Sequence, residues 1–398
     1  MITHASIVPL IGGLPLAQKV AFKSKPKYAM SYDAFYNNDR HYVEYSKAPY
    51  HVLKLDEENK SPGTVDVVGA TCPCAGLSSL STNASPDKEV NDWMFHSTKF
   101  VLETVRPKVL WGENAPRLAG SMGKPIVAKL RELAAQNGYT MSIVKTMSKI
   151  HGLSQTRDRS FYFFWKGTQV PMFNFVQREQ ESIVDTILNT NLRDDDPMSN
   201  QLVNEEKPSQ NPYYRYVLEE LEGGITHQEF QEKIEKTWGL FSYIETKTTY
   251  DKVGKWMEEQ GYDREVPKCY RKFEKLAQGK NIMRHSIHVP KTTIGAFVGS
   301  LPTTLIHPIE DRYLNIRECL TIMRMPDDFQ LIGGKKNLNH ICQNVPVSTA
   351  ADWAEQIKLY LNGKLQMIDT EFMMFDNKSQ KVEYEKPQIA LTEFMKIA

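Results

Sequence analysis

Short apolar runs alternate with longer amphipathic stretches through the first third of the chain. The short runs are typical of buried strands, and apolar residues spaced three or four apart are typical of helices. The expected strands cover residues 5–11, 28–33, 64–70, 109–111, 139–147 and 161–165. The expected helices cover residues 14–22, the stretch from Pro86, capped by Ser85, to Pro107, and a stretch that begins at Pro125. This alternation predicts an α/β fold with a doubly wound, mostly parallel sheet.

This alternation of apolar strands and amphipathic helices stops after about residue 166, and the apolar pattern resumes from about Arg312. The later part contains an expected helix over residues 350–361 and an alternating stretch, residues 366–386, that could form a hairpin about Asn377-Lys378. We therefore expect a large domain in two segments, residues 1–165 and 305–398, with a smaller domain inserted at residues 166–304.

Charge becomes informative only when it is followed along the chain. The 398 residues include 49 Lys plus Arg and 48 Asp plus Glu, which gives a formal net charge of +1. Residues 179–222 hold 11 acidic and 3 basic side chains, whereas residues 264–291 hold 8 basic and 2 acidic ones. The near-neutral total therefore averages over two unlike stretches, and it does not exclude a nucleic-acid partner.

Neither the apolar segments nor the cysteines point to a membrane or a metal. No run of 18 apolar residues is present, and the first residues lack the zones of a signal peptide. The five cysteines are irregularly spaced and include no CxxC pair. We expect a cytoplasmic protein with reduced thiols, no membrane segment and no metal site.

Two candidate catalytic residues follow predicted strands. Cys74, in Thr71-Cys72-Pro73-Cys74, comes after the strand over residues 64–70, at the sheet edge where ligands bind in open α/β folds. It could act as a nucleophile there, although most cysteines are small buried hydrophobes. Glu113 follows the strand over residues 109–111 and belongs to the same edge, but a helix cap or a solvated loop acid explains it more simply.

Two further motifs fit either a ligand site or an ordinary structural role. Gln155, Arg157 and Arg159 alternate as they enter a strand, so their side chains would share one face, although a solvated strand edge explains them at least as well. Gly12-Gly13 separates the first strand from the first helix. Glycines there let a cofactor approach the backbone, but a plain tight turn needs the same residues.

The order and spacing of these motifs resemble those of the cytosine-C5 DNA methyltransferase family. The resemblance covers residues 5 to about 362, and it implies a Rossmann-like class I methyltransferase fold with an inserted target-recognition domain. The matching segments are Pro73-Cys74 for the catalytic loop, Glu113-Asn114-Ala115 for the Glu-Asn-Val element, residues 155–159 for the Gln-x-Arg-x-Arg strand, residues 311–319 and 325–329 for the late block, and Val345-Pro346 for the closing motif.

The resemblance implies a covalent reaction on a cytosine that is flipped out of double-stranded DNA. Cys74, as a thiolate, would add to ring carbon 6, and Glu113 would hydrogen-bond the ring nitrogen and the exocyclic amine. Arg157 and Arg159 would hold the base oxygen, the catalytic loop and the DNA backbone. Carbon 5 would take a methyl group from S-adenosylmethionine, and loss of its proton would release Cys74.

The cofactor-handling residues match the family less well than the base-handling residues do. Val8 and Leu10 stand where the family has an aromatic residue and a glycine, and Ser31 stands where an acid holds the cofactor ribose. We therefore expect S-adenosylmethionine or a modified relative as the cofactor. The residues expected to bind it are Gly12, Gly13, Tyr32, Asp33, Asp56, Pro73 and Asn344.

The inserted domain contains a basic stretch that would contact DNA phosphates, although a solvated helix face explains it equally well. The expected partner is double-stranded DNA, and we expect a monomer from a bacterial or phage-infected cell with a role in restriction-modification. The cations of the stretch are Lys268, Arg271, Lys272, Lys275, Lys280 and Arg284.

Three hypotheses about DNA follow from the resemblance and its departures. A fourth hypothesis, a tRNA substrate, is disfavoured because the middle region has no Cys-Phe-Thr element. The first is a DNA (cytosine-5)-methyltransferase that uses S-adenosylmethionine. The second keeps the base chemistry but changes the donor or the transferred group, as in DNA hypermodification. The third is a catalytically inactive DNA-binding homologue. The altered cofactor residues motivate both alternatives to the first hypothesis.

Overall fold

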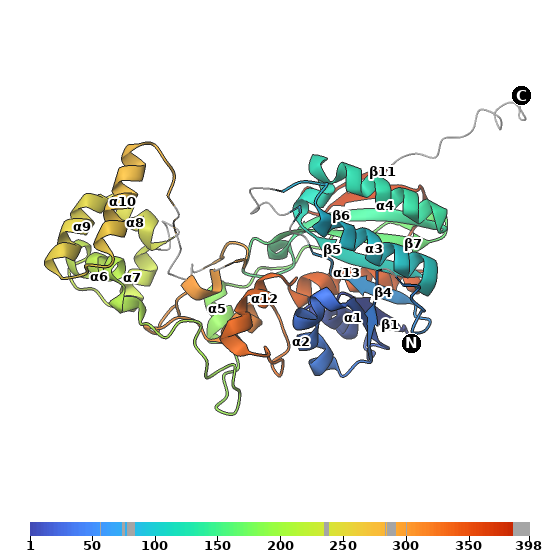
Figure 1. Cartoon of the computed structure of the whole chain (residues 1–398), viewed down its shortest axis with the longest axis horizontal. Helices are drawn as coiled ribbons and strands as arrows, with labels where there is room; N and C mark the ends of the chain where they lie inside the picture. The colour runs from blue at the N-terminus through green and yellow to red at the C-terminus, as the bar shows by residue number, and fades with distance from the viewer. Residues whose placement is uncertain are drawn as a thin grey trace, which may run out of the picture.

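A computed structural model describes residues 1–55, 57–73, 76–77, 84–234, 239–282, 284, 292–299 and 301–384. These residues form a large α/β domain and a smaller helical body at one end of the molecule (Figure 1). Two residues of the predicted site, Asp56 and Cys74, lie outside the described residues.

A nine-stranded sheet runs through the described part of the large domain in the order β11-β10-β6-β7-β5-β4-β1-β2-β3. Its strands are β1 (His4–Ile7), β2 (Ala29–Tyr32), β3 (Tyr50–Leu53), β4 (Val67–Ala70), β5 (Val109–Asn114), β6 (Tyr139–Met147), β7 (Asp158–Lys166), β10 (Phe372–Asp376) and β11 (Lys381–Tyr384). Neighbours are parallel, except that β7 is antiparallel to β5 and β6, and β11 to β10. The predicted mostly parallel α/β sheet is therefore confirmed.

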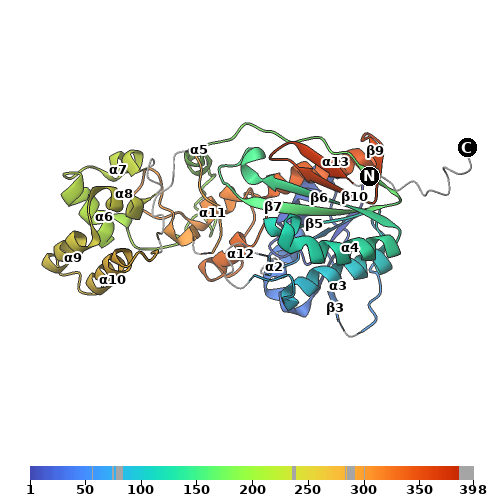
Figure 2. The ribbon, with the colours of Figure 1, turned by 90° about the horizontal axis from the view of Figure 1, so that it is seen from above.

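Helices cover both faces of the sheet (Figures 1 and 2). The helices of the large domain and its junction with the smaller body are α1 (Gly13–Phe22), α2 (Tyr36–Ser46), α3 (Asp92–Phe100), α4 (Lys124–Gln136), α11 (Ile316–Ile322), α12 (Leu338–Cys342) and α13 (Val347–Leu361). In β7, Phe161, Phe163 and Trp165 join the core beneath α1 and α13. Tyr162 and Phe164 join the core beneath α3 and α4. Because both faces are covered, the strand is a continuous apolar run.

The predicted hairpin after the last helix is confirmed, and it extends the central sheet. β10 and β11 pair antiparallel, and β10 also pairs parallel with β6, where Met373 lies beside Ser142. Met373 and Phe375 are buried, so the hairpin adds to the core over β6. A small sheet of β8 (Gln169–Pro171) and β9 (Met367–Asp369) precedes it.

The helix expected to begin at Pro86 begins later, at Asp92. Ser85 Oγ does accept a hydrogen bond of 3.2 Å from the backbone N–H of Asp87, as a helix cap would. The side chain of Asn91, however, donates to the carbonyls of Ser85 and Pro86. Because a side chain binds these carbonyls, the chain makes a turn and then a short 3-10 helix, Glu89–Asn91, before α3 starts.

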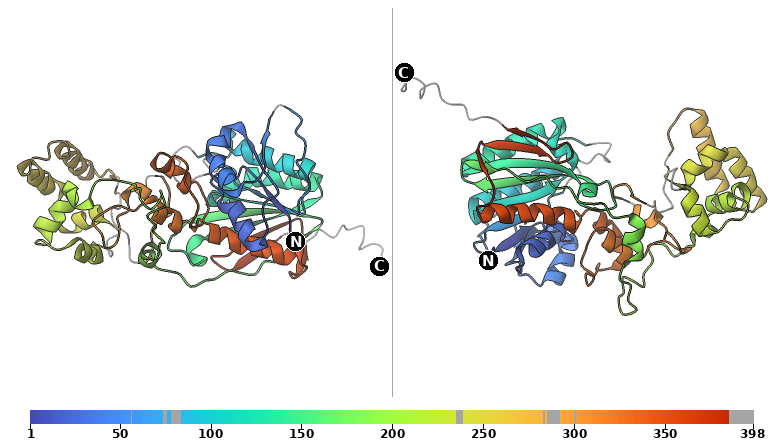
Figure 3. Two further views of the ribbon diagram at one scale, coloured as in Figure 1. Left: turned by 90° about the horizontal axis from the view of Figure 1, so that it is seen from below. Right: turned by 180° about the vertical axis from the view of Figure 1, so that it is seen from behind.

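The smaller body consists of short helices that lie together, away from the sheet (Figure 3). Its helices are α6 (Pro212–Tyr216), α7 (His227–Ile234), α8 (Leu240–Lys247), α9 (Tyr250–Glu259) and α10 (Val266–Ala277), and α5 (Ile183–Leu188) precedes them. A Cβ atom at Gly254 of α9 would lie 2.9 Å from the ring of Tyr270, so glycine lets α10 pack closely on α9. The boundaries near residues 166 and 304 remain a prediction.

A buried ion pair joins the segments on either side of the inserted helices. Arg317 Nε lies 2.7 Å from Asp196 Oδ2, and each side chain is 1% exposed. Burial by itself would raise the pKa of Asp196, but hydrogen bonds from Arg317, Ser199 and the Met198 N–H hold it at about 2. Arg317, part of the late sequence block, is therefore a structural residue at this junction.

Candidate active site

Glu113 and Arg159 meet at the carboxyl end of β5. The Nε atom of Arg159 lies 3.1 Å from Oε2 of Glu113, and the side chains are 11% and 3% exposed. Within the described part of the chain, neither of these two atoms makes a hydrogen bond of good geometry. A buried carboxylate and guanidinium with unused hydrogen-bonding capacity are suited to a polar, planar ligand, because leaving such groups unsatisfied is costly.

Residues close to Glu113 have structural roles. Asn114 Oδ1 accepts a 2.8 Å hydrogen bond from the N–H of Ala115, which shapes the turn after β5. Cys72 is buried, and its Sγ lies 3.9 Å from the hydroxyl oxygen of Tyr162. Burial raises the pKa of the Cys72 thiol to about 11, so it stays protonated at neutral pH. Cys72 therefore lacks the properties of a nucleophile.

Gln155 and Arg157 contact segments that are far away in the sequence. Arg157 is fully buried, and it donates to the carbonyls of Phe297, at 2.8 Å, and Cys342, at 2.7 Å. Gln155 accepts from the N–H of Phe297 at 3.4 Å. Both residues precede β7, which begins at Asp158. The structure therefore places Arg159 against Glu113, whereas Arg157 links Phe297, near the end of the inserted segment, to Cys342 at the end of α12.

Contacts within the chain explain the two glycines before α1. Gly12 has a φ of +105°, and a Cβ there would lie 2.6 Å from the ring of Tyr42. The N–H of Gly13 donates to Asn344 Oδ1 at 2.8 Å, and a Cβ at Gly13 would lie 2.2 Å from the carbonyl oxygen of Val345. These contacts indicate that both positions need glycine for close packing. Direct contact of Gly12, Gly13 or Asn344 with a cofactor stays a prediction.

The turn between β1 and α1 is strained at two residues that are not glycine. Val8 has a φ of 48° and Leu10 a φ of 50°, a region that is costly for L residues and especially for a β-branched one. The Leu10 N–H donates to Asp39 Oδ1 at 2.8 Å, and Tyr50 donates to Asp39 Oδ2 at 3.1 Å. Strain held by such contacts is common where a backbone is shaped for a ligand.

Asp39 was not among the predicted site residues. It is fully buried beside the turn, and burial raises the pKa of its carboxyl to about 7, although the hydrogen bonds from the Leu10 N–H and the Tyr50 hydroxyl oppose the rise. The sequence offers one indication of its role, because Asp39 is an acid three residues before Tyr42, on the buried side of α2. That indication could be found only after α2 itself was recognised.

Aromatic rings surround the end of β2. The centre of the buried Tyr32 ring lies 4.9 Å from that of Trp93, and the centre of the Phe35 ring lies 5.0 Å from that of Trp93. Asp33 is exposed and Pro73 half-buried. Sequence reasoning singled out Tyr32 and Asp33 but missed Phe35 and Trp93, because Trp93 comes from a distant helix.

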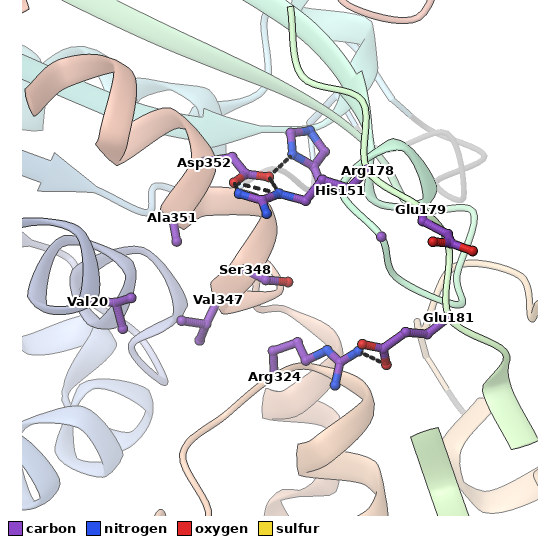
Figure 4. A pocket seen from close by; sticks show the side chains of 11 residues that line it. Val20, His151, Arg178, Glu179, Glu181, Arg324, Val347, Ser348, Ala351 and Asp352 are labelled. Atoms are coloured by element: carbon purple, nitrogen blue, oxygen red, sulfur yellow. Dashed lines mark hydrogen bonds and ion pairs between the residues drawn. The ribbon is translucent and has the colours of Figure 1, made fainter. Parts of the chain in front are cut away.

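A separate cavity of about 650 Å³ lies between α1, the first turn of α13 and the segment before α5 (Figure 4). Asp352 accepts from Arg178 Nε at 3.0 Å and lies 2.8 Å from Nδ1 of His151. Burial would raise the pKa of Asp352, but these hydrogen bonds hold it below its ordinary value. None of the predicted site residues lines this cavity.

The described residues show neither a membrane span nor a metal centre. No helix among them is long and apolar enough to span a membrane. Likewise, they contain no group of three or more His, Cys, Asp or Glu side chains placed to hold a metal ion.

Comparisons with known proteins extend these observations. The sequence profile of the family described as C-5 cytosine-specific DNA methylase matches residues 21–359. Type II methyltransferase M.PspPI of Psychrobacter sp. strain TA137 is 25% identical over 371 residues, which cover 88% of this chain and 77% of that protein.

Solved structures share the fold at low sequence identity. A DNA modification methyltransferase encoded within a prophage of E. coli has a TM-score of 0.57 and 15% identity, covering 91% of this chain and 100% of that one. Methyltransferase EhMeth of Entamoeba histolytica has a TM-score of 0.53 and 12% identity, covering 91% and 99%. The class I methyltransferase fold expected from the sequence is therefore confirmed.

Proposed function

The chain belongs to the C-5 cytosine-specific DNA methylase family and is a DNA cytosine methyltransferase, and we propose that it methylates carbon 5 through a covalent Cys74 adduct. The methyl donor in this proposal is S-adenosylmethionine, and the substrate is a cytosine flipped out of duplex DNA. The observation that carries the proposal is the buried pair of Glu113 and Arg159 at the carboxyl end of β5, with its unused hydrogen-bonding atoms.

Cys74 starts the reaction in this proposal. Its thiolate forms a bond to ring carbon 6, and the displaced electron pair moves toward carbon 5 and the ring nitrogen. Glu113 hydrogen-bonds the ring nitrogen and the exocyclic amine, where charge develops, and Arg159 holds the base oxygen. After the methyl group is bonded to carbon 5, loss of the carbon-5 proton restores the ring and breaks the bond to Cys74. Arg157 acts as a positioning residue through the carbonyls that it binds.

The residues at the ends of β1 and β2 fit a cofactor with an adenine and a charged tail. The aromatic rings of Tyr32, Phe35 and Trp93 offer apolar faces for adenine, and the strained turn through Val8 and Leu10 has the character of a backbone shaped for a ligand. S-adenosylmethionine, when bound there, supplies an electrophilic methyl group. Asp33 and Pro73 would complete the site, with Asp56 as a further acid from the sequence.

Substitution of two neighbouring cysteines tests the nucleophile. We expect Cys74→Ala to abolish methyl transfer to duplex DNA and to abolish covalent trapping on DNA that contains 5-fluorocytosine, because the trapped adduct needs the thiolate. Cys72→Ala is the matched control, since Cys72 lies two residues away and is buried as a thiol. Turnover or trapping by purified Cys74→Ala protein would contradict the assignment.

A second candidate keeps the Cys74 chemistry but changes the transferred group. It is favoured by Leu10, which holds a positive φ where the family has glycine, and by Ser31, where the family has an acid. Mass spectrometry of nucleosides from DNA of expressing cells separates the two candidates. A product consisting only of 5-methylcytosine would eliminate the second.

We also propose a biological role, a cellular location and an oligomeric state for the protein. The type II methyltransferase name of M.PspPI supports a role in restriction-modification. We place the protein in the cytoplasm of a bacterial or phage-infected cell, where it acts as a monomer. Sedimentation of the purified chain alone and with duplex DNA measures its oligomeric state.

A further inference from the structure

The turn between β1 and α1 holds its two strained residues in different ways. The N–H of Val8 donates to the carbonyl of Met30 on β2 at 2.9 Å, so the edge of the sheet supports that residue. The N–H of Leu10 donates instead to a side chain, Asp39 Oδ1, at 2.8 Å. Leu10 has a φ of 50°, a conformation that is costly for a residue with a Cβ atom. The hydrogen bond that supports Leu10 therefore comes from outside the turn.

Asp39 joins three elements through one buried carboxyl. The residue is in the first turn of α2 and is fully buried. Besides the Leu10 N–H, its carboxyl accepts a hydrogen bond of 3.1 Å from the hydroxyl of Tyr50 on β3. Burial raises the pKa of this carboxyl to about 7, because the charged form loses its solvation. An apolar side chain would avoid that cost and still fill the space, so the two hydrogen bonds account for the presence of an acid.

The turn that Asp39 supports adjoins the proposed cofactor site. The turn follows β1, and the neighbouring strand β2 ends at Tyr32, whose ring is part of the aromatic group proposed for adenine. Leu10 and Tyr32 also belong to one buried apolar cluster. Asp39 has no exposed surface of its own, so it is not placed to touch a ligand. Any effect of Asp39 on a cofactor is therefore transmitted by the backbone of the turn.

We propose that Asp39 is a positioning residue for the cofactor, because it holds Leu10 in the left-handed conformation and so shapes the turn before the cofactor binds. This inference rests on the proposed function for the identity of the ligand. Without Asp39, the turn populates other conformations, and the apparent affinity falls with the fraction that keeps the correct one. The substitution Leu10→Gly would reduce this dependence on Asp39, because glycine adopts the left-handed conformation without steric cost.

A double-mutant cycle, read by calorimetry of S-adenosylmethionine binding to the full chain, tests the coupling between Asp39 and Leu10. Asp39→Ala should weaken binding by roughly tenfold or more, because nothing then holds the strained residue. Asp39→Asn should stay within about threefold of the wild type, because its side-chain oxygen still accepts from the Leu10 N–H. In a Leu10→Gly background, Asp39→Ala should cost less than about threefold. In a Leu10→Ala background the full loss should return, since alanine keeps the Cβ atom.

Kinetics and a control on the same helix separate positioning from a general loss of stability. Asp39→Ala should raise the KM for S-adenosylmethionine and leave the KM for DNA unchanged. Glu44→Ala should bind the cofactor as the wild type does, because Glu44 is exposed on α2 and pairs with Arg40 at 3.3 Å. Wild-type affinity in Asp39→Ala would overturn the inference. So would equal losses in the Leu10→Gly and Leu10→Ala backgrounds, because Asp39 would then act through the packing of α2 and not through Leu10.

Hydrogen exchange at the Leu10 amide tests the same role without a cofactor. We expect this exchange to be at least roughly tenfold faster in Asp39→Ala than in the wild type or Glu44→Ala, because the amide loses its acceptor. If Asp39→Ala does not fold, Asp39→Leu replaces it, since leucine fills the space but accepts no hydrogen bond. A wild-type chain that does not bind S-adenosylmethionine would count against the proposed function. Exchange would then decide the inference alone, and an unchanged rate at Leu10 would overturn it.

Discussion

Glu113 and Arg159 come from different strands, and each keeps a buried atom without a hydrogen bond in the described residues. The two charges offset each other at 3.1 Å, but neither atom makes a well-oriented hydrogen bond, so both keep hydrogen-bonding capacity for a ligand. The flipped cytosine offers both a ring nitrogen and a carbonyl oxygen, so one base can engage both side chains. At the scale of single residues, the unsatisfied groups are therefore the strongest structural support for the proposed chemistry.

The substitution Glu113→Gln keeps the shape of the side chain and removes its charge. We expect the single-turnover rate of methyl transfer to fall by roughly 100- to 1000-fold, because charge that develops on the ring loses its stabilising partner. Glu132→Gln is the control, since Glu132 is exposed on α4, where its carboxylate accepts a hydrogen bond from Gln136. Rates within about threefold of the wild type for Glu113→Gln would show that Glu113 is not catalytic.

The elements differ in how well local sequence predicts them. β7 was predicted because helices cover both faces, which makes the whole strand apolar. α2 and β3 were not predicted. Only Asp39, His41 and Tyr42 are buried in α2, and β3 is an edge strand with His51 and Val52 exposed. Elements that bury few side chains carry little hydrophobic periodicity.

The hairpin of β10 and β11 gives a prediction at the scale of elements. Phe375→Ala should lower the free energy of unfolding by about 3 kcal/mol, because the ring is buried in the core over β6. Tyr384→Ala, on the neighbouring strand but 45% exposed, should lower it by less than about 1 kcal/mol. Chemical denaturation of both variants measures the difference. Equal losses would mean that the hairpin does not contribute to the core as described.

For the whole molecule, buried charges stabilise the junction between the two bodies. The Asp196–Arg317 ion pair is buried where the chain leaves and re-enters the large domain. Glu318, the next residue, completes the cap of α11 with Asn315 and accepts hydrogen bonds from Arg312 at 2.8 and 2.9 Å. Arg317 thus stabilises the junction, whereas Glu318 and Arg312 stabilise the start of α11.

Asp196→Asn tests this junction. It should lower the free energy of unfolding at neutral pH by about 3 kcal/mol, because a buried guanidinium loses its counter-charge. The folded-state pKa of Asp196 is lowered to about 2, so its contribution is present above pH 4 and is lost as the pH falls from about 4 to 2. The difference between the wild type and the variant should therefore shrink over that range.

Asp195→Asn serves as the control for this measurement. Its carboxylate is 84% exposed and pairs with Arg193 at 3.5 Å, so the change should stay within about 0.5 kcal/mol at any pH. A large effect of Asp195→Asn, or a difference for Asp196→Asn that persists at pH 2, would contradict the role of the buried pair.

The sequence by itself determined most strands of the sheet, its mostly parallel character and the shared edge at which β4 and β5 end, because buried strands and helix periodicity are local properties of the chain. It also determined the family, since five short motifs in one order are read without coordinates. Only the tertiary structure decided which side chains meet. Arg157 binds carbonyls 140 and 185 residues away, and Asp39 supports the turn at Leu10 across 29 residues. Such contacts depend on packing between distant segments, which no local pattern encodes.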